Sequence, residues 1–231
     1  QIKYKQFGGN EIFLKDDFEK LHNSLAKIDD INKLIEPLFN DKVFELNKNK
    51  FNFQNTLDEL IFNKFEGQID TGEMMDALLN KAYKSNIRII NNVSVESYED
   101  IGPSVKVNTN QFTISCNKLF IATNGFSESI IQEKVVPARA QVLITKPIKN
   151  LKVIGTFHFQ QGYYYFRNID DRILLGGGRN LDFHIENTNQ FGVTDTIQSK
   201  LEQLLTDVIL PQSNFEIEQR WSGIMGIGNK K

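Results

Sequence analysis

The segment GYYYFRNIDDRILLGGG, residues 162–178, predicts two antiparallel strands joined by an Asp-Asp turn. Successive side chains of a strand point to opposite faces of its sheet. Tyr163, Tyr165 and Arg167 would therefore share one face, and the residues between them would share the other. This hairpin predicts a sheet with antiparallel strands in the second half of the chain.

The face with two phenols and a guanidinium carries groups that could bind a ligand. It could bind a carboxylate or an amide while its rings pack against a flat or apolar ligand. The alternative is a half-buried strand whose hydroxyls are satisfied within the protein. The three glycines at 176–178 allow close approach of another group, which suits a flat ligand, or they form a bulge or turn at a strand end.

The rest of the chain predicts a mixed α and β fold, of the α+β class, with a large, mostly antiparallel sheet and flanking helices. Apolar residues three and four apart predict helices over 18–34, 70–86 and 193–210, and the second of these would bury a stripe that includes Met75 and Leu78. Asp70 or Thr71 can cap that helix. Further predicted elements are a hairpin around residues 8–10, a helical or irregular piece over 55–65, and strands over 119–122, 141–147 and 214–226.

Composition excludes several classes of function. The 27 basic and 29 acidic residues give a net charge of −2 with no block of five like charges, so a nucleic-acid partner is not expected. No apolar run is long enough for a transmembrane segment. The single cysteine, Cys116, excludes an internal disulfide and fits a reducing compartment, so we expect a cytoplasmic protein.

Short catalytic motifs are missing from the sequence. It holds no HExxH or CxxC, so no metal site is expected, and it holds no GxSxG, GxGxxG or P-loop. Two further residues are weak candidates for a binding site. His158 lies close to the tyrosines, and Arg139 follows a proline at a strand entry, although an arginine in that place is more often part of an ion pair.

Several segments, in their order along the chain, resemble the D-amino-acid oxidase and glycine oxidase superfamily of FAD-dependent oxidoreductases. They are EGQIDTGEMMDALLNKAYKSNIRIINNVSV at 66–95, KLFIATNGFS at 118–127, VVPARAQVLIT at 135–145, the tyrosine hairpin, and RWSGIMG at 220–226. The resemblance covers about residues 66–228. It implies FAD as the cofactor and a small amine or amino acid as the substrate.

The resemblance assigns residues to the cofactor and to catalysis. Val95 would face the adenine with its backbone, and Trp221 and Gly223 would lie beside the isoalloxazine. The cofactor would also be lined by the residues after the strand at 119–122, which are Ala122, Thr123, Asn124 and Gly125. Asn124 stands where the family usually has glycine. The tyrosine face, with Tyr163, Tyr165 and Arg167, would lie above the flavin and supply the catalytic groups, with His158 among the substrate-binding residues.

One departure from the family concerns the substrate. Met225 stands where many members have the arginine that binds the substrate carboxylate, and a thioether cannot pair with a carboxylate. Either Arg167 or Arg139 supplies the charge, or the substrate is an amine without an α-carboxylate, which we favour.

The implied reaction is hydride transfer to the flavin from the carbon next to an amine. Alternatives are a flavoenzyme acting on a 2-hydroxy acid or a modified RNA base, and a binding module without catalysis.

The resemblance also implies that the chain is a fragment, incomplete at both ends. The family begins with a strand, a GxGxxG turn and a helix that hold the FAD pyrophosphate, and we expect the chain alone to bind FAD poorly and to be inactive. The expected organisation is a first part of the substrate domain at 1–66, a central part of the FAD-binding domain at 67–135, and a second part of the substrate domain at 136–231.

Overall fold

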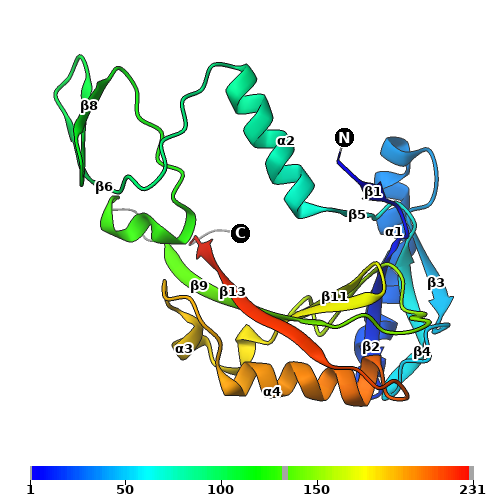
Figure 1. Ribbon diagram of the computed structural model, residues 1–231. Coiled ribbons are helices and arrows are strands. Elements are labelled where there is room, and N and C mark those ends of the chain that lie inside the picture. Colours follow the sequence, from blue (N-terminus) through cyan, green and yellow to red (C-terminus); the bar gives the residue numbers. More distant parts are fainter. Residues whose placement is uncertain (1, 132–134, 229–231) are drawn as a thin grey trace.

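The computed structural model describes residues 2–131 and 135–228 and has a mixed α+β fold built on one large sheet (Figure 1). The sheet has eight strands in the order β13-β9-β12-β11-β10-β2-β4-β3. Strands β2 and β10 pair in parallel, and every other neighbouring pair in the sheet is antiparallel. The predicted fold class is confirmed.

The strands of the large sheet come from both ends of the chain. They are β2 (Gly9–Leu14), β3 (Phe44–Lys48), β4 (Thr56–Asn63), β9 (Val136–Thr145), β10 (Thr156–Phe159), β11 (Tyr164–Ile169), β12 (Arg172–Gly177) and β13 (Ile217–Ile227). Two smaller sheets consist of β1 (Tyr4–Lys5) with β5 (Gln68–Ile69), and of β6 (Val95–Asp100), β7 (Val105–Thr109) and β8 (Thr113–Cys116).

Helices flank the sheet. The α-helices are α1 (Phe18–Phe39), α2 (Thr71–Lys84), α3 (Phe183–Glu186) and α4 (Asp195–Leu204). Shorter turns of 3₁₀-helix are η1 (Asn124–Ser129) and η2 (Arg179–Leu181), and α4 continues as a π-helical turn, η3 (Leu205–Ile209).

One face of the sheet forms the main hydrophobic core against α4 and η3. Phe157, Phe166 and Leu175 from the strands pack with Leu201 and Leu205, and all five are almost completely buried. Each such side chain stabilises the fold by about 1.5–3 kcal/mol relative to exposure. This face therefore carries most of the energy that holds the sheet to its helices.

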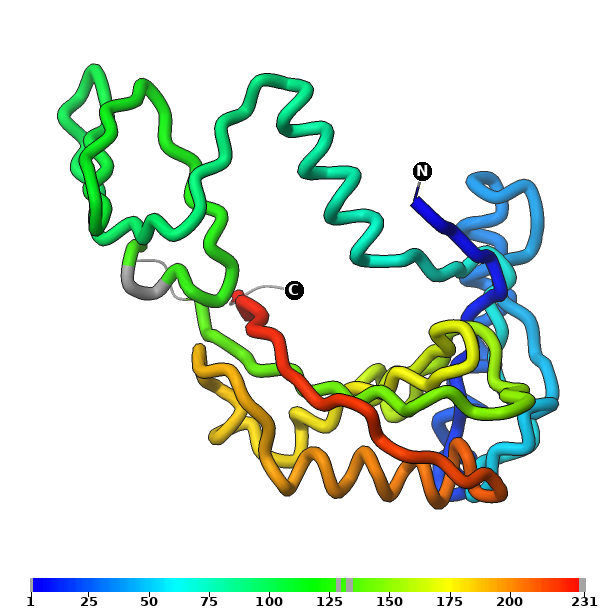
Figure 2. The backbone as a smooth tube through the Cα atoms, viewed as in Figure 1, coloured from blue at the N-terminus to red at the C-terminus, as the bar shows by residue number. Residues whose placement is uncertain are grey.

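The opposite face, which we call the open face, carries Tyr165 and Trp221. Helix α1 covers only its β2–β4 end, where Phe13, Leu21 and Ile61 form a second, smaller core. Figure 2 shows the chain leaving the large sheet after β4, passing through β5, α2 and the three-stranded sheet, and returning at β9, on the side opposite α4. The rest of the open face is thus left accessible.

Several predicted elements are confirmed. The hairpin in 162–178 is β11 and β12, the helix over 193–210 is α4 with η3, and the last strand is β13. Helix α2 begins after Asp70, whose side chain accepts a hydrogen bond from the Glu73 backbone N–H at 3.0 Å. This is the capping arrangement that the sequence predicts.

Other predicted elements are wrong. The hairpin around 8–10 does not form, because β1 pairs with β5 while β2 pairs with β10 and β4. The piece over 55–65 contains strand β4, which pairing on both sides stabilises against its weak helical pattern. Residues 119–122 form no strand, because no described segment pairs with them. On α2, Met75 and Leu78 are exposed rather than buried.

Candidate active site

Six residues form one row across the open face, at the same level on six neighbouring strands. From β13 to β2 they are Trp221, Val142, Gly176, Tyr165, His158 and Glu11. Residues directly opposite one another on paired strands share a face of the sheet and lie within contact distance. The register therefore brings an indole, a phenol, an imidazole and a carboxylate, contributed by distant parts of the sequence, onto one surface.

Gly176 makes room for the Tyr165 ring. A Cβ atom at Gly176 would lie 2.7 Å from the hydroxyl end of Tyr165 and 2.5 Å from a methyl carbon of Val142. The phenol ring thus extends across the glycine toward β9. Partial burial raises the pKa of Tyr165, so the hydroxyl stays protonated at neutral pH and can donate a hydrogen bond.

His158 forms an ion pair with Glu11, its direct neighbour on β2. The imidazole Nδ1 faces a carboxylate oxygen of Glu11. This hydrogen bond raises the pKa of His158, more than its partial burial lowers it. The open face therefore carries the His158 imidazole beside the Tyr165 phenol, with the Glu11 carboxylate that favours its protonated form on the next strand.

Arg167 lies two residues beyond Tyr165 on the same face. Its Nη1 donates to the Ile69 carbonyl oxygen at 2.8 Å, immediately before α2 begins. A guanidinium has five N–H donors, so this bond fixes its position and leaves other donors free. Arg167 thus ties the sheet to the β5–α2 junction at the border of the open face.

Alternate residues of β13 form a flat area beside the row. Trp221, Gly223 and Met225 all point to the open face and are exposed. A Cβ atom at Gly223 would meet no atom within 4 Å, and the residue opposite it on β9 is the small Ala140. The floor between the indole and the thioether is therefore bare backbone with open space above it, which suits a flat ring.

The segment that ends in η1 is attached to the outer edge of β13 through Asn124. The Asn124 side-chain amide donates to the Ile224 carbonyl at 3.1 Å, and its oxygen accepts from the Gly226 N–H at 2.7 Å. Its φ of 50° is left-handed, a conformation that asparagine and glycine tolerate best. Gly125 next to it has no room for a side chain, because a Cβ would lie 2.5 Å from the Met225 carbonyl oxygen.

The neighbouring predicted residues lie beside this attachment. Ala122 is exposed, and the Thr123 hydroxyl is buried without a hydrogen-bond partner among the described residues. A buried hydroxyl without a partner costs free energy, so a group that hydrogen-bonded to this atom would stabilise the site.

Three predicted site residues lie apart from the row, from the floor beside it and from the Asn124 attachment. Val95 begins β6 in the three-stranded sheet, which is separate from the large sheet that carries the row. Tyr163 lies in the turn before β11, and its ring contacts Phe183 of α3 with centroids 6.3 Å apart. Because β11 begins one residue later than the predicted strand face requires, the ring of Tyr163 turns toward α3 rather than lying beside Tyr165.

Arg139 points to the other face of the sheet, where it is buried. Its guanidinium forms two hydrogen bonds of 2.9 Å with Glu186, whose carboxylate also accepts from Gln141. Burial raises the pKa of Glu186, but the bonds from Arg139 and Gln141 outweigh it, so the net shift is downward. The ion-pair interpretation of Arg139 is confirmed, and its position below the sheet excludes contact with a ligand on the open face.

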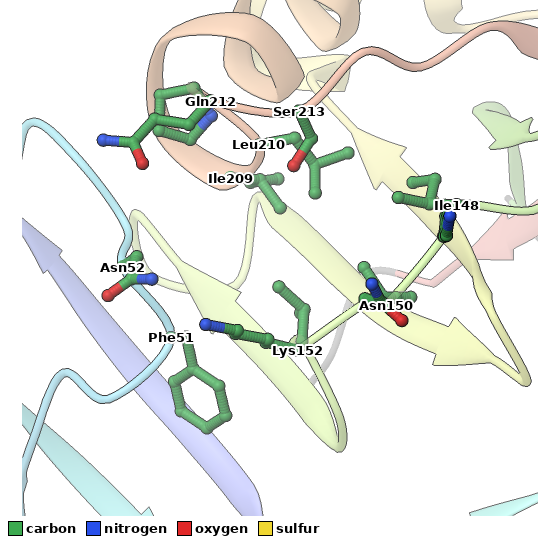
Figure 3. Close-up of a pocket in the computed structure, with 13 residues that line it drawn as sticks. Phe51, Asn52, Ile148, Asn150, Lys152, Ile209, Leu210, Gln212 and Ser213 are labelled. Atoms are coloured by element: carbon green, nitrogen blue, oxygen red, sulfur yellow. The ribbon is translucent and has the colours of Figure 1, made fainter.

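Two further observations concern features outside the open face. A cavity of about 190 Å³ lies on the α4 side, between residues 148–153 and 209–213 (Figure 3). Its lining is apolar, amide, lysine and serine side chains, which offer no acid–base pair. Within residues 2–131 and 135–228, no group of three histidine, cysteine or carboxylate side chains is arranged to bind a metal, and no helix is long and apolar enough to cross a membrane.

The model of the DAO family of FAD-dependent oxidoreductases matches residues 8–230. The chain belongs to this family. A search among curated protein sequences finds no match.

Solved structures share the fold. L-proline dehydrogenase from P. horikoshii superposes with a TM-score of 0.80 at 20% identity, over 99% of this chain and 62% of that one. Glycine oxidase from Geobacillus kaustophilus gives 0.77 at 13% identity, over 99% and 61%, and glycine oxidase from Bacillus cereus ATCC 14579 gives 0.75 at 15%, over 97% and 61%. The chain thus spans about three fifths of the length of these structures.

The cofactor of this DAO-family chain is FAD. When bound, FAD supplies a hydride acceptor. The residues present fit a flat ring system, because the bare floor at Gly223 would be filled by any side chain and is bounded by Trp221 and Met225. Segment 122–125 ends against the same strand, and the unpartnered Thr123 hydroxyl lies there. Trp221, Gly223 and Met225 would hold the ring, and residues 122–125 would contact the adjoining part of the cofactor.

Sequence reasoning missed two acidic residues of the open face. Glu11 pairs with His158, and Glu66 lies directly above Gly9 on β2. Neither has a motif around it. The signal that could have pointed to Glu66 was the Gly8-Gly9 pair. The sequence predicted a turn there, whereas in the structure Gly9 leaves room for the Glu66 carboxylate.

Proposed function

We propose that the flavoprotein containing this chain oxidises an amine or an amino acid at a CH–NH group, with the hydride leaving the carbon next to the nitrogen. The observation that carries the proposal is the row on the open face. It places the Tyr165 phenol, which reaches across Gly176 toward β9, between the flat floor at Gly223 on β13 and the His158–Glu11 pair on β10 and β2. The similar structures include a proline dehydrogenase and two glycine oxidases, whose names support the same substrate class.

The chain's own residues would act mainly by orientation. A protonated Tyr165 would donate a hydrogen bond to the substrate and hold it above the floor, and the surrounding aromatic surface would exclude water. Hydride transfer to a flavin needs little acid–base machinery from the protein. The side chains of the row therefore suffice for binding and positioning.

The arginines favour an amine without an α-carboxylate. Arg139 is paired with Glu186 on the other face, and Arg167 already donates to Ile69. Met225 occupies a position on the floor where it offers a thioether and no charge. A substrate carboxylate would have to rely on the remaining donors of Arg167 at the border of the face.

Anaerobic reduction of the flavin tests this proposal. The flavin-loaded protein is mixed with primary and secondary amines, amino acids and 2-hydroxy acids, and loss of oxidised-flavin absorbance is followed. Amines should reduce the flavin fastest. Reduction by 2-hydroxy acids alone, or by no compound of the panel, would contradict the proposal, the latter favouring a binding module.

A matched pair of tyrosine variants tests the site. Tyr165→Phe should slow reduction about 10- to 100-fold, because a hydrogen bond that orients the substrate is lost. Tyr98→Phe is the control, since Tyr98 is equally exposed but lies on the three-stranded sheet. Equal rates in both variants would remove Tyr165 from the site.

Two broader features belong to the same proposal. We assign residues 1–66 and 136–231 to a substrate domain and residues 67–135 to a FAD-binding domain. A cytoplasmic location is proposed from the single cysteine.

A further inference from the structure

A cavity of about 350 Å³ opens next to His158, at the end of the open face that α1 covers. One wall is apolar and is formed by Ile28 and Ile31 of α1 together with Ile61 of β4. The facing wall is formed by charged side chains, described next. The volume matches the lower range of small-molecule sites, and a mainly apolar lining with a few polar groups is typical of them.

Glu66 is seated in this cavity by a glycine. A Cβ atom at Gly9 would lie 1.2 Å from the Glu66 Oε2, so only glycine at this position leaves room for the carboxylate. The same oxygen accepts a hydrogen bond from the Thr156 hydroxyl at 3.3 Å, and the Glu66 backbone carbonyl accepts from the Gly8 N–H at 3.0 Å. The Glu66 carboxylate therefore lies against the sheet, with the Thr156 hydroxyl as its hydrogen-bond donor.

The charges in the cavity do not cancel locally. Glu11 is neutralised by His158. Glu66 forms no ion pair within the part of the chain that the structure describes. Lys27 also lines the cavity, but from the exposed rim on α1. A carboxylate that is fixed, partly buried and unpaired favours a cation beside it.

The cavity is continuous with the row on the open face. His158 lines the cavity and is also the direct neighbour of Tyr165 across β10 and β11. A molecule bound over Tyr165 can therefore extend past His158 toward Glu66 along the apolar wall. The order of groups met along this path is phenol, imidazolium, apolar side chains and carboxylate.

We infer that this cavity binds the far end of the substrate, and that this end is an apolar chain carrying a second positive charge, as in an α,ω-diamine. The inference rests on the proposed function, since it adds a specificity site to the same substrate. Glu66 pairs with the distal ammonium, and Ile28, Ile31 and Ile61 contact the methylene chain. Oxidation occurs at the other end of the molecule, beside the Tyr165 phenol, which is two strands away from β2 and reaches across Gly176 toward the floor.

The test compares diamines with monoamines of equal chain length. The flavin-loaded protein, its Glu66→Gln variant and the control Glu45→Gln are used, since Glu45 is exposed on the neighbouring strand β3. Kinetics of flavin reduction are measured with a series of linear diamines, alkylamines and ω-amino acids. The shift of the flavin spectrum measures binding of the same compounds to the flavin-loaded protein, in a time too short for turnover.

We expect one diamine length to bind at least 10-fold more tightly than the matching alkylamine. In Glu66→Gln this advantage should fall about 10-fold, mainly through KM, while the Glu45→Gln protein keeps it. Equal affinity for diamines and alkylamines in the unaltered protein would overturn the inference, even if Glu66→Gln failed to fold. Preference for ω-amino acids would also overturn it, because it would assign the cavity to an anion at His158 and Lys27.

The two proposals fail in different ways. If no amine reduces the flavin, the proposed function is wrong. If amines reduce it without regard to a distal charge, the function holds and the cavity assignment is wrong.

Discussion

Replacing Gly223 by alanine should damage cofactor chemistry while leaving the fold intact. The new Cβ would meet no protein atom within 4 Å, and Gly223 is outside the left-handed backbone region. At such a position, alanine stabilises a protein by about 0.4–1 kcal/mol, because it restricts the unfolded chain. The melting temperature of the flavin-free protein should therefore stay the same or rise.

The effect on the flavin follows from contact distances. Carbon atoms pack at about 3.5–4.0 Å, so a ring resting on Gly223 cannot keep its place when a methyl carbon projects about 1.5 Å from the backbone. The ring must move away by roughly that length. A misplacement of about 1 Å at a reacting centre costs on the order of 100-fold in rate. We expect flavin reduction in Gly223→Ala to slow by about that factor, with weaker retention of FAD.

Three measurements check this prediction. They are the melting temperature with and without FAD, the flavin content after gel filtration, and the single-turnover rate of flavin reduction. Gln219→Ala is the control, since Gln219 is exposed on the same strand, four residues earlier. Unchanged flavin content and rate in Gly223→Ala would refute the assignment of the floor. A marked loss of stability without FAD would show that Gly223 is needed for packing instead.

Three other variants probe the parts that hold the site. Arg139→Leu leaves the buried Glu186 without its ion pair and should lower the free energy of unfolding by about 3–5 kcal/mol in denaturant titrations, so a loss below 1 kcal/mol would contradict the buried pair. Asn124→Ala removes two hydrogen bonds to β13 and should cost about 1–3 kcal/mol of stability. Asn124→Gly removes the same bonds but keeps the left-handed backbone conformation. Equal stability of both variants and the parent would disprove the attachment. The pKa of His158 is raised by Glu11, so the His158–Glu11 pair should stabilise the fold fully below the ordinary histidine pKa of 6.5 and lose this effect as pH rises through the higher folded-state pKa. The difference in free energy of unfolding between the parent and His158→Gln should therefore shrink with rising pH, and a difference that grows with pH would contradict the pair.

The local elements were largely predictable. Alternation in 162–178 identifies two strands and correctly places Tyr164 and Phe166 on the face opposite Tyr165, which the structure shows to be buried, and Asp70 marks the start of α2. These features depend on residues that are neighbours in sequence, where period and capping are strong signals.

Features that depend on distant pairing were not predictable. The parallel contact between β2 and β10 joins Glu11 to His158 across most of the chain, and no local pattern specifies it. Strand β4 was misassigned for the same reason, since its two neighbours stabilise it. Residues 119–122 have the composition of a strand, but a strand needs a partner, and none of the described segments supplies one.

The residues of the candidate site show the same contrast between local signals and distant pairing. Local alternation placed Tyr165 and Arg167 on one face of a strand, whereas Trp221 and Gly223 were indicated by the resemblance to the family. Alternation also placed Tyr163 beside Tyr165, which fails because the strand begins one residue later. Glu66 was missed because its place above Gly9 exists only in three dimensions.

The attachment of Asn124 has a consequence for solution behaviour. Strand β13 is the outermost strand of the large sheet, so its outward amide and carbonyl groups could recruit a strand from another molecule. The Asn124 amide occupies two of these groups, at Ile224 and Gly226. A single side chain thereby blocks part of this edge of the sheet against pairing with a strand of another molecule. Its loss should promote aggregation under conditions in which the protein is still folded.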